Sequence, residues 1–145
     1  MILKILMKKL LILFISLFAA TAIADEFDSR QALTVTDAQR AKILHEMRAL
    51  LTGTQNILAG LSNDDMAVVA QAASAIGMGM VEKVEDDVKA ALPQEFRQLG
   101  MSVHQDFDRI AADAEALKDP KHTLQQLSQT MGKCIACHAG YQIGN

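Results

Sequence analysis

The sequence predicts a small all-α protein, an antiparallel four-helix bundle in a single domain. Its composition disfavours a β-sandwich, because aromatic residues make up 4% of the 145 residues and there are two prolines and no tryptophan. Four stretches repeat apolar residues at every third or fourth position, as amphipathic helices do. The connections between these stretches are mostly short, which favours antiparallel neighbours.

The N-terminus has the features of an export signal. Three lysines precede a mostly apolar stretch over residues 10–20, and Ala22-Ile23-Ala24 supplies a small-x-small cleavage pattern. A membrane anchor is the alternative, but the run is shorter than the roughly 18–20 residues that a transmembrane helix needs. We therefore expect residues 1–24 to be a signal peptide cleaved after Ala24, and residues 25–145 to form the mature domain.

Cleavage makes the protein more acidic. It removes three lysines and no acidic residue, so the formal net charge changes from −3 to −6. This charge disfavours nucleic acid and anionic membrane surfaces as partners. The expectation is an exported, periplasmic protein without a stable membrane anchor.

The first helix is expected over residues 37–61, after an irregular lead-in at 25–35. Thr36 and Gln39 have the spacing of a capping box, which marks a helix start. An apolar stripe follows at helical spacing, formed by Leu44, Met47, Leu51, Thr54, Leu58 and Leu61 and widened by Ile43, Leu50 and Ile57.

Three more helices are expected over residues 64–90, 93–118 and 120–141. Gly77 and Gly79 lie within the second, where they predict a kink or a close backbone approach. Pro93 marks the boundary before the third helix. Asp119 and Pro120 form a cap and a first helical position for the fourth. No strand is expected.

The chemistry of the chain is concentrated in Cys134-Ile135-Ala136-Cys137-His138, since these are its only cysteines. C-x-x-C-H is the attachment signature of c-type haem. Two thiols one helical turn apart can form thioethers along one edge of a porphyrin. The next residue, His138, is then placed to bind the iron from the proximal side.

The cysteines have three other possible uses. A disulfide between Cys134 and Cys137 would close a very small loop, where the entropic stabilisation is least. A thioredoxin-like redox pair needs a βαβ context, which this sequence lacks. A zinc site could take both thiols and His138, but no fourth ligand follows at helical spacing. Export together with C-x-x-C-H favours haem c, one per chain.

The position of the motif points to a family. An export signal, four amphipathic helices and a terminal Cys-Ile-Ala-Cys-His-Ala-Gly-Tyr resemble the cytochrome c′ family and its low-spin, methionine-ligated relatives. The resemblance implies a bundle with covalently bound haem near one end, attached at Cys134 and Cys137 with His138 as the proximal ligand. It also implies a homodimer packed through the first two helices.

In that family a residue of the first helix faces the distal side of the iron. Met47 lies within about 10° of the centre of the apolar stripe, counting 100° per residue, and His45 lies on the opposite side. With the resemblance added, Met47 is the expected distal ligand, although core packing is its alternative role. The apolar residues that would instead leave the sixth position open are Leu44, Leu50 and Leu51.

Other residues are weaker candidates. His104 is expected at the boundary of the third stripe rather than as a ligand. A haem propionate could pair with Arg40, Arg48 or Lys133. Tyr141 is expected at the haem edge or over the bundle end. Core or flanking positions are expected for the other methionines in the three C-terminal helices, among them Met78, Met80 and Met101.

The sequence therefore predicts a periplasmic monohaem cytochrome that transfers one electron at a time to a periplasmic redox partner, and not an enzyme. No nucleophile–base pair and no glycine-rich phosphate loop is evident. A five-coordinate haem protein that binds nitric oxide or carbon monoxide is the alternative. A helical bundle without haem is the third hypothesis.

Overall fold

The computed structural model describes residues 28–144, which are mostly helical. The longer helices are α2 (Asp37–Ser62), α3 (Met66–Ala75), α6 (Gln94–Ala116) and α7 (Pro120–Gly140), and the shorter ones are α4 (Met78–Val81) and α5 (Asp86–Ala91). The expected all-α class is confirmed. The expected signal peptide lies outside the described residues. Within the described residues, no helix combines the length and apolarity needed to span a membrane.

Polar caps start the helices where the sequence places them. Thr36 Oγ1 accepts a hydrogen bond from the Gln39 amide (3.3 Å), and Gln39 Oε1 accepts one from the Thr36 amide (3.0 Å), which completes the expected capping box. At α7, Asp119 Oδ1 accepts from the amides of Lys121 (2.9 Å) and His122 (3.2 Å). These bonds satisfy amides that have no partner inside their helix.

The helix expected over 64–90 is not continuous. It is divided into α3, α4 and α5, with Gly77 in an extended conformation between the first two. The Met78 amide donates to Asp108 Oδ2 of α6 at 3.1 Å. A side chain at Gly77 would overlap the same carboxylate. The close approach expected at this glycine is therefore found, and it interrupts the helix instead of bending it.

A short strand pair joins the two ends of the described chain. β1 (Gln31–Leu33) runs parallel to β2 (Tyr141–Ile143), with Gln31 opposite Tyr141 and Leu33 opposite Ile143. The expectation of an irregular lead-in and no strand was wrong here. Three residues carry too little periodicity to indicate a strand, and their partner lies more than a hundred positions away.

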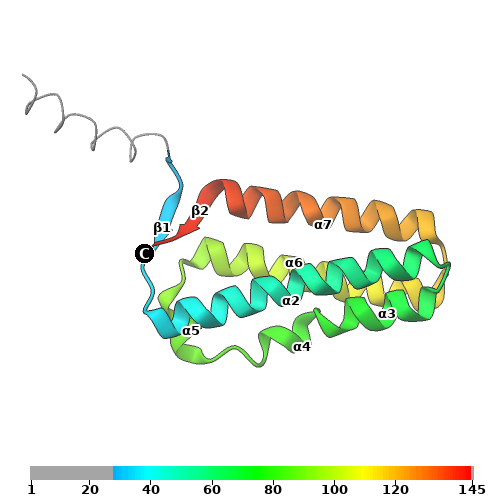
Figure 1. Cartoon of the computed structure of the whole chain (residues 1–145), viewed down its shortest axis with the longest axis horizontal. Helices are drawn as coiled ribbons and strands as arrows, with labels where there is room; N and C mark the ends of the chain where they lie inside the picture. Colours follow the sequence, from blue (N-terminus) through cyan, green and yellow to red (C-terminus); the bar gives the residue numbers. More distant parts are fainter. Residues whose placement is uncertain (1–27, 145) are drawn as a thin grey trace, which may run out of the picture. The chain divides into compact units, whose positions relative to one another are not determined.

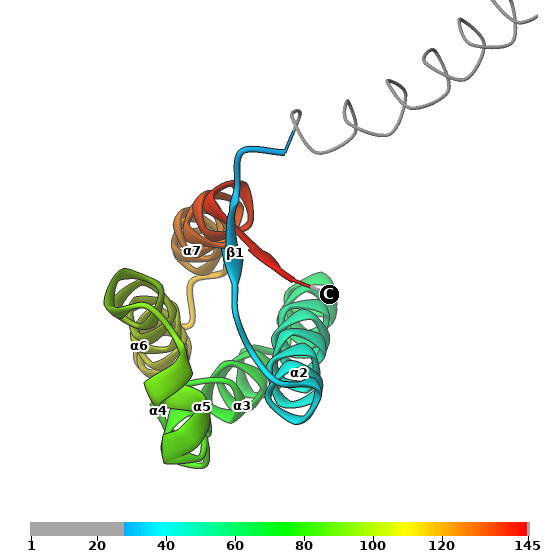
Figure 2. The ribbon, with the colours of Figure 1, turned by 90° about the vertical axis from the view of Figure 1, so that its left-hand side faces the viewer.

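The longer helices lie side by side in the part of the molecule that follows Arg30 (Figures 1 and 2). α3 packs against both α2 and α6, and α6 packs against α7. In the described part of the chain, α2 and α7 make little direct contact with each other. The main core lies where α3 meets its neighbours, and its buried members are Ile57, Met66, Val69, Ala70, Ala73, Ile76, Val103, Phe107, Ile110, Ala114 and Leu127.

The buried face of α2 differs from the expected stripe. Ile43 and Ile57, which widen the expected stripe, are buried as predicted, and the other buried residues of α2 are Gly53 and Gly60. Leu51 and Leu58, which the stripe places at its centre, are 71% and 47% exposed. The reason is that α3 approaches α2 closely at the two glycines. Helical periodicity considers only apolar side chains and therefore does not detect such a contact. A methyl group at Gly60 would lie 2.8 Å from a methyl carbon of Val69.

Candidate functional site

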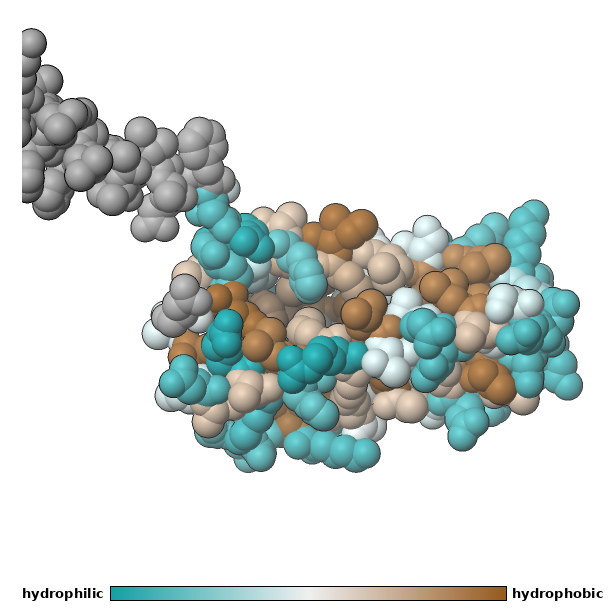
Figure 3. All heavy atoms as spheres, in the orientation of Figure 1, coloured by the Kyte–Doolittle hydropathy of each residue, from teal (hydrophilic) through white to brown (hydrophobic). Residues whose placement is uncertain are grey.

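A cavity of about 550 Å³ lies beyond the main core, between α2 and the C-terminal part of α7, with α6 along one wall. This volume is within the usual range of about 300–1,000 Å³ for sites that hold small molecules and cofactors. Most of its lining is apolar. The surface is hollowed between α2 and α7 (Figure 3), where these two helices make little contact with each other.

The C-x-x-C-H motif lines one wall of this cavity. Cys134, Cys137 and His138 all border it, because residues three and four positions apart share one face of α7. Both cysteines are half-buried and are not joined in a disulfide. Burial raises the pKa of both thiols above the ordinary value. The thiols are therefore protonated at neutral pH, and His138 lines the cavity together with them.

The zinc alternative gains no support from this arrangement. Among residues 28–144, no group of three or more histidine, cysteine, aspartate or glutamate side chains is placed to hold a metal ion.

Met47 lies in the same cavity. It is half-buried on α2 and contributes to the lining together with Leu50, whereas Leu44 and Leu51 do not. Of the three apolar alternatives for the distal position, the structure therefore leaves Leu50. His45 is exposed, as expected. The structure thus brings the expected distal residue and the attachment motif to one cavity.

Two of the other candidate methionines lie at the core and at the cavity. Met80 of α4 packs against the main core, as expected. Met101 of α6 is 39% exposed and also lines the cavity. It is a second thioether within the site, which its position away from the third stripe did not indicate.

His104 is not the boundary residue that its helical angle predicts. It is 2% exposed, and it lines the cavity. Its Nδ1 lies 2.8 Å from the Ile76 carbonyl oxygen, and its Nε2 lies 3.1 Å from Glu46 Oε1. Burial alone lowers its pKa, but the hydrogen bonds to Glu46 and Ile76 outweigh burial and raise that pKa above the ordinary value. Helical periodicity could not locate it, because its partners belong to other helices.

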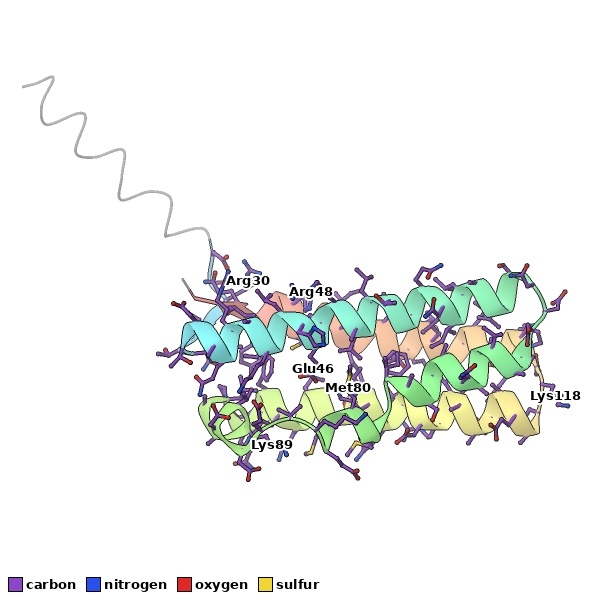
Figure 4. All side chains as sticks on the ribbon, turned by 60° about the horizontal axis from the view of Figure 1, so that its bottom comes forward. Arg30, Glu46, Arg48, Met80, Lys89 and Lys118 are labelled. Carbon is purple, nitrogen blue, oxygen red and sulfur yellow. The ribbon has the colours of Figure 1, made fainter. Side chains whose placement is uncertain are left out.

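The cations around the cavity are not the expected ones. Lys133 Nζ forms an ion pair with Asp106 Oδ2 at 2.5 Å and donates a hydrogen bond to the Ser102 carbonyl oxygen at 3.2 Å. Arg48 lies on the side of α2 opposite Glu46 (Figure 4). Neither side chain lines the cavity, and Arg40, whose Nε is buried without a hydrogen-bond partner, does not line it either.

Two other cations do border the cavity. Lys89 of α5 and Arg97 of α6 contribute to its lining. Lys89 also lies 3.7 Å from an oxygen of Asp86. Sequence reasoning missed both residues. For Lys89 the reason is that α5 is separated from the continuous helix that the periodicity predicts over 64–90.

Aromatic residues pack beside the cavity. Phe96 lines it, and the Tyr141 ring meets the Phe96 ring edge-on, with the ring centroids 5.2 Å apart. Tyr141 follows directly after the end of α7. This contact joins the residues after the C-x-x-C-H motif to the start of α6.

Comparison with known proteins identifies no relative. No family model, curated protein or solved structure matches this chain.

Proposed function

We propose that this protein is a periplasmic monohaem c-type cytochrome that carries one electron at a time. Haem c is attached at Cys134 and Cys137, and His138 is its proximal ligand. The observation that carries the proposal is the single cavity lined by these three residues and by Met47. The fold is an antiparallel four-helix bundle like that of the cytochrome c′ family, which the sequential packing of α2, α3, α6 and α7 supports.

The residues around the cavity suit this cofactor. Two half-buried, protonated thiols one turn apart are the groups that form thioethers with the vinyl groups of haem. An imidazole and a thioether are the axial donors of low-spin cytochromes. The mostly apolar wall provides the low-dielectric surroundings that such a group needs. Lys89 and Arg97 border the same space and offer positive charge for propionates.

Each group of side chains around the cavity has its own role in the proposed electron carrier. When bound, haem supplies a one-electron couple between ferric and ferrous iron. The protein holds it through two thioethers, so that it is retained in a dilute compartment outside the cytoplasm. His138 and Met47 would be the side chains that hold the iron, and the bound group would then serve electron transfer and not the binding of a small ligand. The apolar wall limits the access of water and thereby tunes the reduction potential.

A gas-binding protein is the second candidate function. Leu50 lines the cavity beside Met47, and an apolar residue at the distal position would leave the iron five-coordinate. We favour the carrier because Met47 also lines the cavity and a thioether is a competent iron ligand. We propose no enzymatic activity for the site.

The proposed assembly is a homodimer that exchanges electrons with a periplasmic redox partner. Leu51 and Leu58 of α2 and Val68 of α3 are large apolar residues with more than 40% of their surface exposed. They belong to the first two long helices, which the resemblance implicates in dimerisation. Exposed apolar residues at an interface favour association through their burial.

The test is the optical spectrum of the protein produced by a host that matures c-type cytochromes. We expect mass spectrometry to find one haem on the C-terminal peptide and the spectrum to be low-spin. Met47→Ala should convert most of the haem to a high-spin form. Met101→Ala is the matched control, since it removes a second thioether from the same cavity, and it should stay low-spin.

Three outcomes would contradict parts of the proposal. An unmodified C-terminal peptide would exclude a c-type cytochrome. A high-spin wild-type protein would favour gas binding. A low-spin spectrum that is lost in Met101→Ala and kept in Met47→Ala would assign the distal position to α6.

A further inference from the structure

One imidazole connects three segments of the fold at the edge of the cavity. His104 belongs to α6, its Nδ1 bonds the Ile76 carbonyl at the end of α3 (2.8 Å), and its Nε2 bonds Glu46 of α2 (3.1 Å). The ring is almost completely buried, whereas the Glu46 side chain is 23% exposed. Both His104 and Glu46 line the cavity.

The hydrogen-bond pattern requires a proton between His104 and Glu46. A carbonyl oxygen only accepts, so Nδ1 carries a hydrogen that it donates to Ile76. Nε2 and a carboxylate oxygen can then bond only if one of them also carries a proton. The pair is therefore either an imidazolium with a carboxylate or a neutral imidazole with a carboxylic acid. In the ionic form the bond is charge-assisted and stronger than a neutral one.

The first half of α2 borders the cavity, and polar contacts connect it to other segments. The His104–Glu46 bond is the buried one among these contacts. Three polar side chains there, at helical spacing, reach the rest of the fold. Gln39 Nε2 donates to the Asp87 carbonyl (3.1 Å), Lys42 pairs with Glu85, and Glu46 bonds His104. The first two bonds lie at the surface, where polar contacts stabilise little.

Glu46 and Met47 are consecutive residues, so the rotation of α2 that fixes one side chain also fixes the other. Glu46 projects from the side of α2 that faces α4, where Met80 lies (Figure 4). Both Glu46 and Met47 border the cavity. Since α2 and α7 make little contact, direct packing against the attachment helix does not set this rotation.

We infer that the His104–Glu46 pair is a positioning device that fixes the rotation of α2 and so presents the Met47 thioether to the cavity. The inference rests on the proposed function, because the readout is methionine ligation. His104 and Glu46 are positioning residues. They act through Met47, and both nitrogens of His104 are already engaged within the protein.

The test compares three substitutions of Glu46 in the haem-loaded protein. Glu46→Ala removes the bond and Glu46→Asp shortens the side chain by one methylene. Glu46→Gln keeps the bond, because its amide can donate to a neutral Nε2 while Nδ1 still donates to Ile76. Lys42→Ala is the control, since it removes a surface contact of the same helix. All are checked by circular dichroism for helical content.

Two measurements report on Met47, namely the low-spin fraction of the ferric protein and the affinity of the ferrous protein for carbon monoxide. Loss of a charge-assisted bond should lower the ratio of methionine-bound to methionine-free haem roughly tenfold or more in Glu46→Ala. Carbon monoxide affinity should rise correspondingly. We expect a smaller change of the same sign in Glu46→Asp. Glu46→Gln, which keeps a neutral hydrogen bond, should change less than Glu46→Ala, and Lys42→Ala should match the wild type.

The outcomes separate this inference from the proposed function. A wild-type spectrum that is high-spin or insensitive to Met47→Ala defeats the methionine-ligated carrier itself. If the wild-type low-spin spectrum depends on Met47 but Glu46→Ala or Glu46→Asp keeps the wild-type low-spin fraction and carbon monoxide affinity, only the positioning role is overturned. Failure of both variants to accumulate, with normal Glu46→Gln, also overturns it, because the pair would then be needed for folding as a whole.

Discussion

At the scale of single residues, two buried polar side chains of α6 connect it to different neighbours. His104 bonds Glu46 of α2. Asp106, also buried, accepts from Thr130 Oγ1 (3.4 Å) and pairs with Lys133 Nζ (2.5 Å), both of α7. Buried charges are tolerated when they are paired and hydrogen-bonded. These bonds therefore specify which helix faces which, in addition to the apolar contacts of the core.

The pH dependence of stability should reveal the His104 pair. Because the folded pKa of His104 is raised, its stabilisation is complete below the unfolded value of about 6.5 and is lost as the pH rises through the folded pKa. We expect the free energy of unfolding to fall over that range. Urea titrations at a series of pH values measure it.

Glu46→Gln is the control for this pH dependence. With the carboxylate gone, the contribution of Glu46 that raises the His104 pKa is lost, whereas burial still lowers that pKa and the backbone hydrogen bond to Ile76 still raises it. The decline above about pH 6.5 should therefore become smaller. An equal decline in wild type and variant would mean that another group is responsible.

At the scale of helices, the contact between α2 and α3 depends on two glycines. A methyl group at Gly53 would lie 2.7 Å from the Cδ1 of Ile76, a flexible side chain. At Gly60 it would lie 3.1 Å from both the Asp65 carbonyl oxygen and the Val69 amide nitrogen. Backbone atoms cannot move aside as a side chain can. Gly60 is therefore the stricter requirement of this helix pair.

Replacing Gly60 by alanine should destabilise the fold. The gain in helix propensity of about 1 kcal/mol is smaller than the cost of overpacking, which is typically about 1–3 kcal/mol and is increased here by the backbone contacts. We expect a net loss of about 1 kcal/mol or more in urea unfolding. Gly79→Ala is the control, since no atom lies within 4 Å of a methyl group there. It should be neutral or slightly stabilising, and an equal loss in both variants would refute the steric argument.

At the scale of the whole domain, the packed core and the cavity occupy different parts of the helices. α3 and its neighbours form the core. The cavity separates the first half of α2 from the last turns of α7, which make little direct contact. Stability is not uniform in such a molecule, because segments with few apolar contacts open more readily. A haem in the cavity would supply the contacts that these segments lack.

Preventing haem attachment should therefore weaken one half of the molecule. In the Cys134→Ser/Cys137→Ser protein we expect most helical content to remain, with α3 and the middle of α6 protected in hydrogen exchange. Exchange over 37–50 and 132–140 should be at least about tenfold faster than in the haem-loaded protein. Uniform loss of protection throughout the chain would contradict this division.

The sequence by itself determined the helical class and the starts of α2 and α7, and it singled out Cys134, Cys137 and His138 as the candidate site, for which haem attachment is our proposal. Each depends on residues within a turn or two, such as the Thr36 capping box. Only the tertiary structure decided the break at Gly77, the β1–β2 pair and the burial of His104. In each case the decisive partner lies far away in sequence, at Asp108, at the opposite end of the domain or on α2. The buried face of α2 was also decided there. Helical periodicity counts apolar side chains, whereas the close approach of α3 depends on glycines that have none.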